Sequence, residues 1–261
     1  MIYYIFFIIV MLCYLLNYLY NIFLIKGLKK INIGEYSIRR IKYLLCEKDI
    51  NELKEVAINS VGIIPKNPIF NNKNLNNKIV LIVYFKNKPI GFNIMFDYKY
   101  ESNTCVHVGL VLINKEYQGK KIQEFCKYNG IFYILENFYK TIYVTDVGRS
   151  ASGLKLFNTI VKTSYPNLLY KNTPTNLYKK IFLNFIEKFK DDTQMSPNAV
   201  GDENTFKIKN SIDKNAGVYY LLEFDDSRKS RDPLYNNLIN SLGPNDDILS
   251  VGKVNLLSIF I

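Results

Sequence analysis

The stretch VGLVLINKEYQGKKIQEF, residues Val108 to Phe125, changes its pattern of apolar residues halfway along. Its first part is an apolar, β-branched run that is typical of a strand. A basic turn, QGKK at 118–121, follows, and apolar residues then recur at helical spacing from Gln123 to Phe138. The stretch therefore predicts a strand that runs through a basic turn into a helix.

Strand and helix alternate again downstream of this stretch. Thr141 to Val147 is a short apolar run that predicts a strand, and Ser150 to Val161 has the spacing of a second helix. Beyond Asp191 the chain becomes polar and rich in Gly, Asn and Asp. Two further strands are predicted in this last part, at Gly217–Phe224 and Asp247–Leu256.

Upstream, the sequence predicts a strand, an amphipathic helix and three antiparallel strands. A polar run at Asn71–Asn77 predicts a surface loop before the three strands. Elements in this order predict an α+β, or mixed α/β, domain whose central, mostly antiparallel sheet is flanked by helices. The predicted elements are a strand at Tyr36–Tyr43, a helix at Cys46–Ser60, and strands at Ile79–Phe85, Pro89–Tyr98 and Thr104–Ile113.

The strand, turn and helix at Val108 to Phe125 resemble the acetyl-coenzyme A site of the GNAT superfamily of N-acetyltransferases. That family carries Q/R-x-x-G-x-G/A at the turn, and the matching hexapeptide here is QGKKIQ at 118–123. The resemblance implies a GNAT-like fold and acetyl-CoA, or another acyl-CoA, as cofactor. Lys121 and Gln123 stand where the family prefers small residues, so a basic turn that only caps the helix is the alternative.

The resemblance also assigns roles to individual residues. In the family, backbone N–H groups at the start of the helix bind the pyrophosphate, and glycines let the backbone come close. The strand before the turn holds the pantetheine arm like an added strand. The implied cofactor-binding residues are Leu112, Ile113, Gln118, Gly119, Lys120, Lys121, Ile122 and Gln123.

The family often carries its general base on the strand that leads into the turn. His107, the only histidine of the chain, lies on that strand two residues before Gly109. An imidazole with a pKa near neutrality can accept a proton from an attacking amine, so His107 is the candidate catalytic residue. The alternative is a histidine that is only packed in the sheet or exposed on its surface.

The second helix resembles the family segment N-x-x-A-x-x-L-Y. The matching residues are SASGLKLF at 150–157, so the family's tyrosine falls on Phe157. In the family this tyrosine often protonates the departing coenzyme A thiolate. A phenyl ring cannot donate a proton, and this role is therefore vacant or filled by another residue.

The N-terminal segment Ile2–Ile25 contains 24 residues without a charge. At roughly 1.5 Å per residue this is about 36 Å of helix, enough to cross a hydrocarbon core of about 30 Å. We expect a single transmembrane helix. The alternatives are a signal peptide, which would need a basic start and a small-residue cleavage site, and a buried core helix.

The residues after this segment predict its orientation. Between Lys26 and Lys42 there are six basic residues and one acid, Glu35, which favours the cytosol for this flank. We therefore expect a single-pass membrane protein whose globular domain faces the cytosol. The basic flank 26–42 is also a candidate surface for anionic lipid.

Composition argues against some other classes of protein. The net charge is +11, but the lysines are spread along the chain rather than gathered in one stripe, so nucleic-acid binding is not favoured. The four cysteines are scattered and form no CxxC pair, so no metal site is predicted.

These observations together predict a membrane-anchored, acyl-CoA-dependent N-acyltransferase that transfers an acetyl group to an amine or protein substrate. The alternative is a non-enzymatic, membrane-tethered protein that keeps the fold with a degenerate cofactor site. The predicted organisation is an anchor at 1–25, a basic linker at 26–35, a GNAT-like domain at 36–190, and a polar linker with C-terminal strands at 191–261.

Overall fold

The computed structural model describes residues 31–120, 122–137, 139–148, 150–193, 195–212 and 232–255. The predicted anchor and the strand predicted at 217–224 lie outside these residues. Within the described residues, no helix is both long enough and apolar enough to cross a lipid bilayer.

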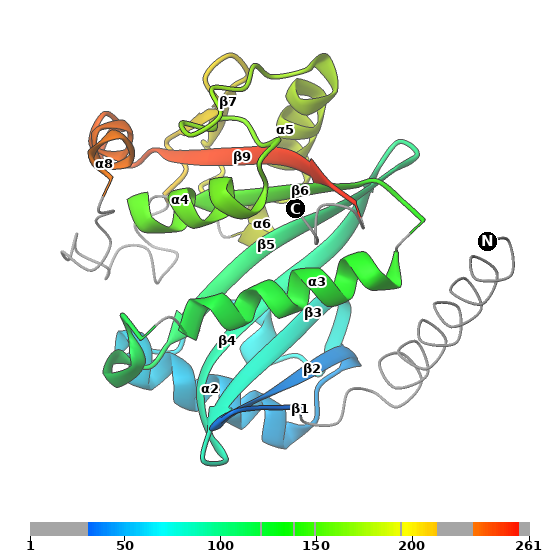
Figure 1. Cartoon of the computed structure of the whole chain (residues 1–261), viewed down its shortest axis with the longest axis vertical. Coiled ribbons are helices and arrows are strands. Elements are labelled where there is room, and N and C mark those ends of the chain that lie inside the picture. Colours follow the sequence, from blue (N-terminus) through cyan, green and yellow to red (C-terminus); the bar gives the residue numbers. More distant parts are fainter. Residues whose placement is uncertain are drawn as a thin grey trace, which may run out of the picture.

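A single nine-stranded sheet organises the described residues, with strand order β1-β2-β3-β4-β5-β6-β9-β8-β7 (Figure 1). Neighbouring strands are antiparallel except β5 and β6, which are parallel. The strands are β1 Ile31–Ile33, β2 Tyr36–Leu44, β3 Asn74–Phe85, β4 Lys88–Tyr100, β5 Asn103–Ile113, β6 Ile142–Gly148, β7 Val200–Asp202, β8 Lys207–Lys209 and β9 Asp247–Val254.

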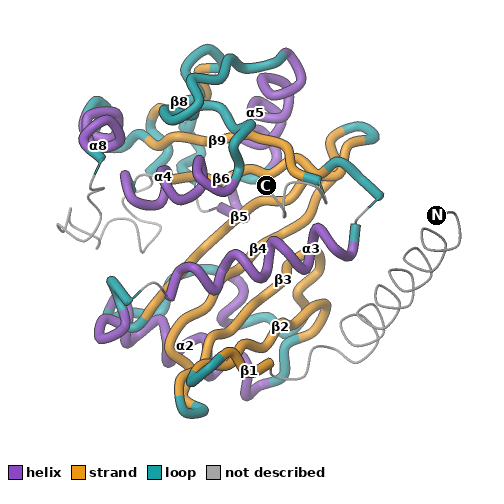
Figure 2. Tube along the Cα trace, viewed as in Figure 1, coloured by secondary structure: helices purple, strands orange, loops and turns teal. Residues whose placement is uncertain are grey.

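Helices cover both faces of the sheet, which gives three layers (Figure 2). Helices α3 and α4 pack on one face and α2 and α5 on the other. The α-helices are α2 Glu47–Val61, α3 Cys126–Glu136, α4 Ala151–Ile160, α5 Asn176–Lys188, α6 Lys190–Thr193 and α8 Pro233–Asn240. The 3₁₀ turns are η2 Pro68–Phe70, η3 Lys115–Tyr117 and η4 Ile122–Phe125. The predicted fold class, a mostly antiparallel sheet flanked by helices, is confirmed.

Local signals explain why the predicted helix at Cys46–Ser60 is observed as α2. Its apolar residues face the sheet, and the side chain of Asp49 accepts a hydrogen bond of 2.8 Å from the backbone N–H of Cys46 at the helix start. The helix ends at Gly62, whose φ of +83° suits a residue without a Cβ. Both ends of α2 are therefore set by residues next to it in the sequence.

The β3–β4 hairpin is also set locally. Its two turn residues, Lys86 and Asn87, have φ angles of +47° and +67°, the conformation that two-residue hairpin turns require. The loop predicted at Asn71–Asn77 is wrong in its second half, because β3 already begins at Asn74. Leu75 is buried there, and Asn74 pairs with Leu44 of β2.

Two predicted boundaries change at the edges of the domain. The linker predicted at 26–35 includes strand β1, which pairs with β2, so residues 31–33 belong to the sheet. The last part of the chain extends the same sheet: β9 pairs with β6 on one side and with β8 on the other. Helix α5, which the sequence analysis did not predict, covers these strands with Phe182 and Phe185.

Candidate functional site

Strands β5 and β6 are paired along only part of their length. The parallel ladder runs from Thr104 and Ile142 to Val108 and Asp146, where it stops. Beyond this point β5 continues to Ile113 with β4 as its only neighbour among the described strands. Figure 1 shows the two strands diverging toward the side where α3 and α4 begin. One edge of β5 is therefore free to pair with an extended ligand.

A β-bulge in β5 accompanies this separation. Val108 pairs with Met95 and Val111 with Asn93, so two residues of β5, Gly109 and Leu110, face one residue of β4. A Cβ on Gly109 would lie 2.8 Å from the backbone oxygen of Ile94, so only glycine fits here. Bulges bend a strand and increase its twist, which turns β5 away from β6.

The predicted turn follows the free part of β5. The side-chain amide of Gln118 donates a hydrogen bond of 3.0 Å to the backbone oxygen of Ile113. Gly119 has a φ of +75° with open space around it, which accounts for the glycine. The ammonium of Lys120 lies 5.1 Å from the ring centre of Tyr117. Lys121 lies outside the described residues.

The start of the helix after the turn is anchored in the core. Ile122 is almost completely buried, in a cluster with Ile38, Leu81 and Phe132. The first turn is the 3₁₀ segment η4, and regular α-helix begins at Cys126, three residues after the predicted start. Leu112 is buried toward α2, whereas Ile113 packs on the α3 side.

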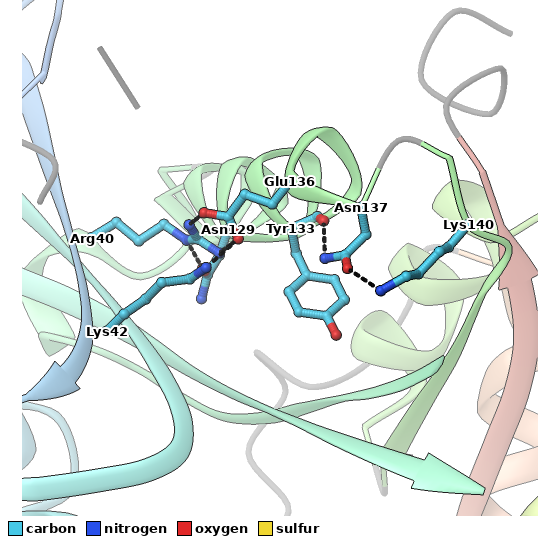
Figure 3. A network of polar contacts seen from close by, with 7 residues as sticks. All are labelled: Arg40, Lys42, Asn129, Tyr133, Glu136, Asn137 and Lys140. Carbon is cyan, nitrogen blue, oxygen red and sulfur yellow. Dashed lines mark hydrogen bonds and ion pairs between the residues drawn. The ribbon is translucent and has the colours of Figure 1, made fainter. Parts of the chain in front are cut away.

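A buried polar network fixes α3 on the sheet (Figure 3). Arg40 of β2 donates from Nε to Asn129 at 2.8 Å and binds both carboxylate oxygens of Glu136, at 2.5 and 3.1 Å. Lys42 also pairs with Glu136, and Asn129 donates to Asn93 of β4 at 2.9 Å. Because a buried pair is costly to break, the network holds α3 in one rotation and its start next to the end of β5.

Helix α4 begins on the same side as α3. The hydroxyl of Ser150 accepts a hydrogen bond of 3.3 Å from the backbone N–H of Gly153 and so caps the helix. Phe157, at the position where the resemblance places a proton-donating tyrosine, is buried among Tyr133, Val144 and Ile142. Its ring is part of the core between α3, α4 and the sheet.

Asp146 occupies the point where β5 and β6 separate. It follows Ile142 and Val144 on the face that carries α3 and α4, because side chains alternate along a strand. Its Oδ2 lies 3.7 Å from the position of a Cβ on Gly148, two residues toward the open end. Burial raises the pKa of Asp146 to about 7, so near neutral pH the carboxylate can accept a proton.

His107 lies one residue away in the ladder but on the opposite face of the sheet. Its ring is packed against Phe185 and Phe96, with centroid distances of 4.6 and 4.9 Å, and only 3% of the residue is exposed. Its Nδ1 lies 3.1 Å from the hydroxyl of Thr145. Burial lowers the pKa of His107 to about 3. These contacts argue against the predicted catalytic role, because a sealed and weakly basic imidazole does not reach a substrate.

The structure thus brings together the end of β5, the turn at 118–120 and Ile122 of the predicted site, and it leaves His107 apart from them. Asp146 was missed by the sequence analysis. The available signal was an acidic residue within the apolar run TIYVTDV, residues 141–147, since a charge in a buried strand needs an explanation.

Comparisons with known proteins give matches among solved structures only. No protein-family model and no curated protein matches the chain. A GNAT family acetyltransferase from Elizabethkingia anophelis with acetyl-CoA bound is 10% identical and matches 85% of this chain and 100% of that chain, with a TM-score of 0.37.

Two further matches cover less of this chain. The ribosomal-protein-S18-alanine N-acetyltransferase from Escherichia coli is 11% identical over 54% of this chain and 85% of that chain, with a TM-score of 0.37. An aminoglycoside acetyltransferase from an uncultured soil metagenomic sample is 17% identical over 42% of this chain and 77% of that chain, with a TM-score of 0.32. Since the similarity is this low, function has to be inferred from the residues of the chain itself.

Proposed function

We propose that the chain is an acyl-CoA-dependent N-acyltransferase that binds its acyl-CoA where β5 and β6 separate. The observation that carries this proposal is the free edge of β5, which begins where the ladder stops at Val108 and Asp146 and leads into the turn at 118–123. The arm of coenzyme A contains amide groups that can pair with such an edge, as an added strand would.

The residues around the edge fit the parts of the cofactor. Gly109 brings the bulge of β5 close to β4, and Gly119 leaves open space at the turn. Lys120 and Lys121 supply positive charge for a pyrophosphate, and the start of η4 and α3 adds backbone N–H groups. The bound acyl-CoA would supply an activated thioester. The chain would bind it, orient it and present it to an amine.

The location of the enzyme belongs to the same proposal. The 24 uncharged residues at 2–25 support a single membrane anchor, and the basic flank 26–42 supports a cytosolic domain near anionic lipid. A site held at a membrane would sample amines of membrane-proximal proteins. Carbonate extraction of membranes, followed by protease digestion of intact vesicles, tests both the anchor and its orientation.

Binding of acetyl-CoA to the full chain, measured by titration calorimetry, tests the cofactor site. We expect Gly109→Val to lower the affinity at least tenfold, because its side chain would collide with the backbone of β4. Gly130→Ala on α3 is the matched control, since a Cβ at that glycine meets nothing within 4 Å. Circular dichroism shows whether each variant is folded.

The substitution of an exposed residue tests the turn and leaves the packing of the core unchanged. Lys120 is exposed, so Lys120→Glu should leave the fold unchanged and weaken acetyl-CoA binding about tenfold at low salt. Lys54→Glu, on α2 and thus on the other face of the sheet, should bind as the unchanged chain does. Absence of binding to the unchanged chain at millimolar acetyl-CoA would overturn the proposal.

A non-enzymatic, membrane-tethered protein with a degenerate cofactor site is the second candidate function. One observation favours it: two backbone N–H groups of the turn, those of Gln118 and Lys120, already bond within the turn at 3.3 Å each. The buried ring of Phe157 adds to this, since it offers no proton. A chain that folds normally and binds no acyl-CoA would select this candidate.

A further inference from the structure

Two polar side chains meet where β5 and β6 separate. Asp146 of β6 and Ser250 of β9 are direct partners in the antiparallel ladder. Partners in such a ladder project their side chains to the same face of the sheet, about 5 Å apart at Cβ. On the other side of Asp146, its parallel partner in β5 is Val108, which offers no polar atom.

The hydroxyl of Ser250 is unusual because it is buried without a partner. Ser250 is 0% exposed, and its Oγ has no hydrogen-bond partner among the described residues. Buried hydroxyls are normally paired, so the unpaired Oγ of Ser250 has the capacity to donate a hydrogen bond to a group nearby. The nearest polar side chain in the ladder is the carboxyl group of Asp146.

Tyr133 of α3 packs on the same face as Asp146, in the cluster with Val144 and Phe157, whereas the charged groups of α3 and α4 nearest to it are already paired. On α4, Lys155 forms an ion pair with Asp232 at 3.4 Å, and on α3 Glu136 is bound by Arg40. Strand alternation places the remaining titratable groups of β5 and β9 on the face that carries α5, as it does for Leu249 and Val251. They are Cys105, His107, Asp247 and Lys253.

We propose that Asp146 is the catalytic proton acceptor of the site and that Ser250 is a positioning residue that donates a hydrogen bond to the ionised carboxylate. This inference rests on the proposed function, because it assigns a role at the same acyl-CoA site. It explains why a carboxyl group stands at the point where β5 becomes free, and why a buried hydroxyl faces it across the ladder.

The proton transfer balances without a further reactant. Asp146 takes one proton from the acceptor ammonium group, which leaves a neutral amine with a free electron pair. The amine nitrogen forms a C–N bond with the thioester carbon, the C–S bond breaks, and the second proton of the nitrogen ends on the coenzyme A sulfur. Asp146 then returns its proton to the solvent.

The test is a titration of the full chain, labelled with ¹³C at the aspartate side-chain carboxyls, by NMR. We expect one aspartate signal to titrate near pH 7, to be absent in Asp146→Asn, and to titrate about one unit higher in Ser250→Ala, since a hydrogen bond to the ionised form lowers a pKa. Ser60→Ala, another buried serine on α2, is the matched control and should leave this signal unchanged.

Ligands then show whether Asp146 lies at the reacting end of the site. Acetyl-CoA should shift the signal of Asp146, whereas adenosine 3′,5′-bisphosphate, which lacks the pantetheine arm, should leave it in place. The inference is overturned if the signal of Asp146 titrates near pH 4, or if acetyl-CoA binds and does not shift this signal. Absence of acetyl-CoA binding in calorimetry instead overturns the proposed function, so the two failures are distinguishable.

Discussion

Where β5 meets β6, burial shifts the pKa of one titratable residue on each face of the sheet, and the two shifts have opposite directions. On the α5 face, burial lowers the pKa of His107 to about 3. On the face of α3 and α4, burial raises the pKa of Asp146 to about 7. In both cases burial favours the neutral form, but only the carboxylate becomes a base that is half ionised near neutral pH. The residue type, and not burial alone, therefore decides which face can accept a proton.

The largest expected difference between the two faces is in how the free energy of unfolding depends on pH. Because the pKa of His107 is lower in the folded state, the unfolded chain takes up a proton first as the pH falls below about 6.5. Stability linked to this residue is then lost on acidification, by about 3 kcal/mol between pH 7.5 and 4. Since the Asp146 contribution has the opposite sign over this range, the His107 contribution is measured as a difference. In urea unfolding, His107→Phe should gain about 3 kcal/mol relative to the unchanged chain between pH 7.5 and 4.

The control for this prediction is the comparison at pH 7.5, where His107 is neutral in both states. There the two proteins should differ by only about 1 kcal/mol, because a phenyl ring can pack against Phe96 and Phe185 as the imidazole does and loses only the contact with the hydroxyl of Thr145. Parallel stability curves of the two proteins down to pH 4 would show that His107 is not sealed in the core.

The contribution of Asp146 to the free energy of unfolding should change with pH in the opposite direction. Its pKa is higher in the folded state, so the folded chain holds the proton longer, and stability linked to this residue falls as the pH rises through about 4 to 7. The expected loss between pH 5 and 8 is about 2 kcal/mol, reduced by the partial exposure of the residue. Asp146→Asn should remove this slope in urea unfolding, and an unchanged slope would contradict the raised pKa.

A smaller effect is expected for Thr145, which lies on the face of His107. Its hydroxyl lies 3.1 Å from His107 Nδ1 and 3.4 Å from the hydroxyl of Tyr98. Thr145→Val should lower the free energy of unfolding by about 1 kcal/mol, since it leaves buried polar groups unpaired. Acetyl-CoA affinity should not change, because this residue points away from the proposed site. A clear loss of acetyl-CoA affinity would mean that residues on both faces of the sheet contribute to the acyl-CoA site.

Elements that are determined by residues a few positions apart in the sequence could be predicted from the sequence. The helix α2, the β3–β4 hairpin and the order of strand, turn and helix at Val108 to Phe125 all follow from periodicity and turn residues a few positions apart. Helix α5 carried a similar signal, since Ile181, Phe182, Phe185 and Ile186 fall at helical spacing.

The chemical character of the site could not be predicted in the same way. The pKa of Asp146 depends on its position at the end of the parallel ladder and on burial that comes with β9 and α4. His107 had the right residue type on the right strand, but Phe185 of α5 and Phe96 of β4 enclose it. These contacts join parts of the chain that no local pattern connects.

The position of β9 between β6 and β8 has a consequence for the newly made chain. As the polypeptide leaves the ribosome, β5, the basic turn, α3 and β6 emerge long before β9 is synthesised. Until then β6 lacks one of its two neighbours, and Asp146 lacks its ladder partner Ser250. The nascent protein would thus contain the free edge of β5, the basic turn and Asp146, and it would gain the proposed positioning residue Ser250 only when its last strand closes the sheet.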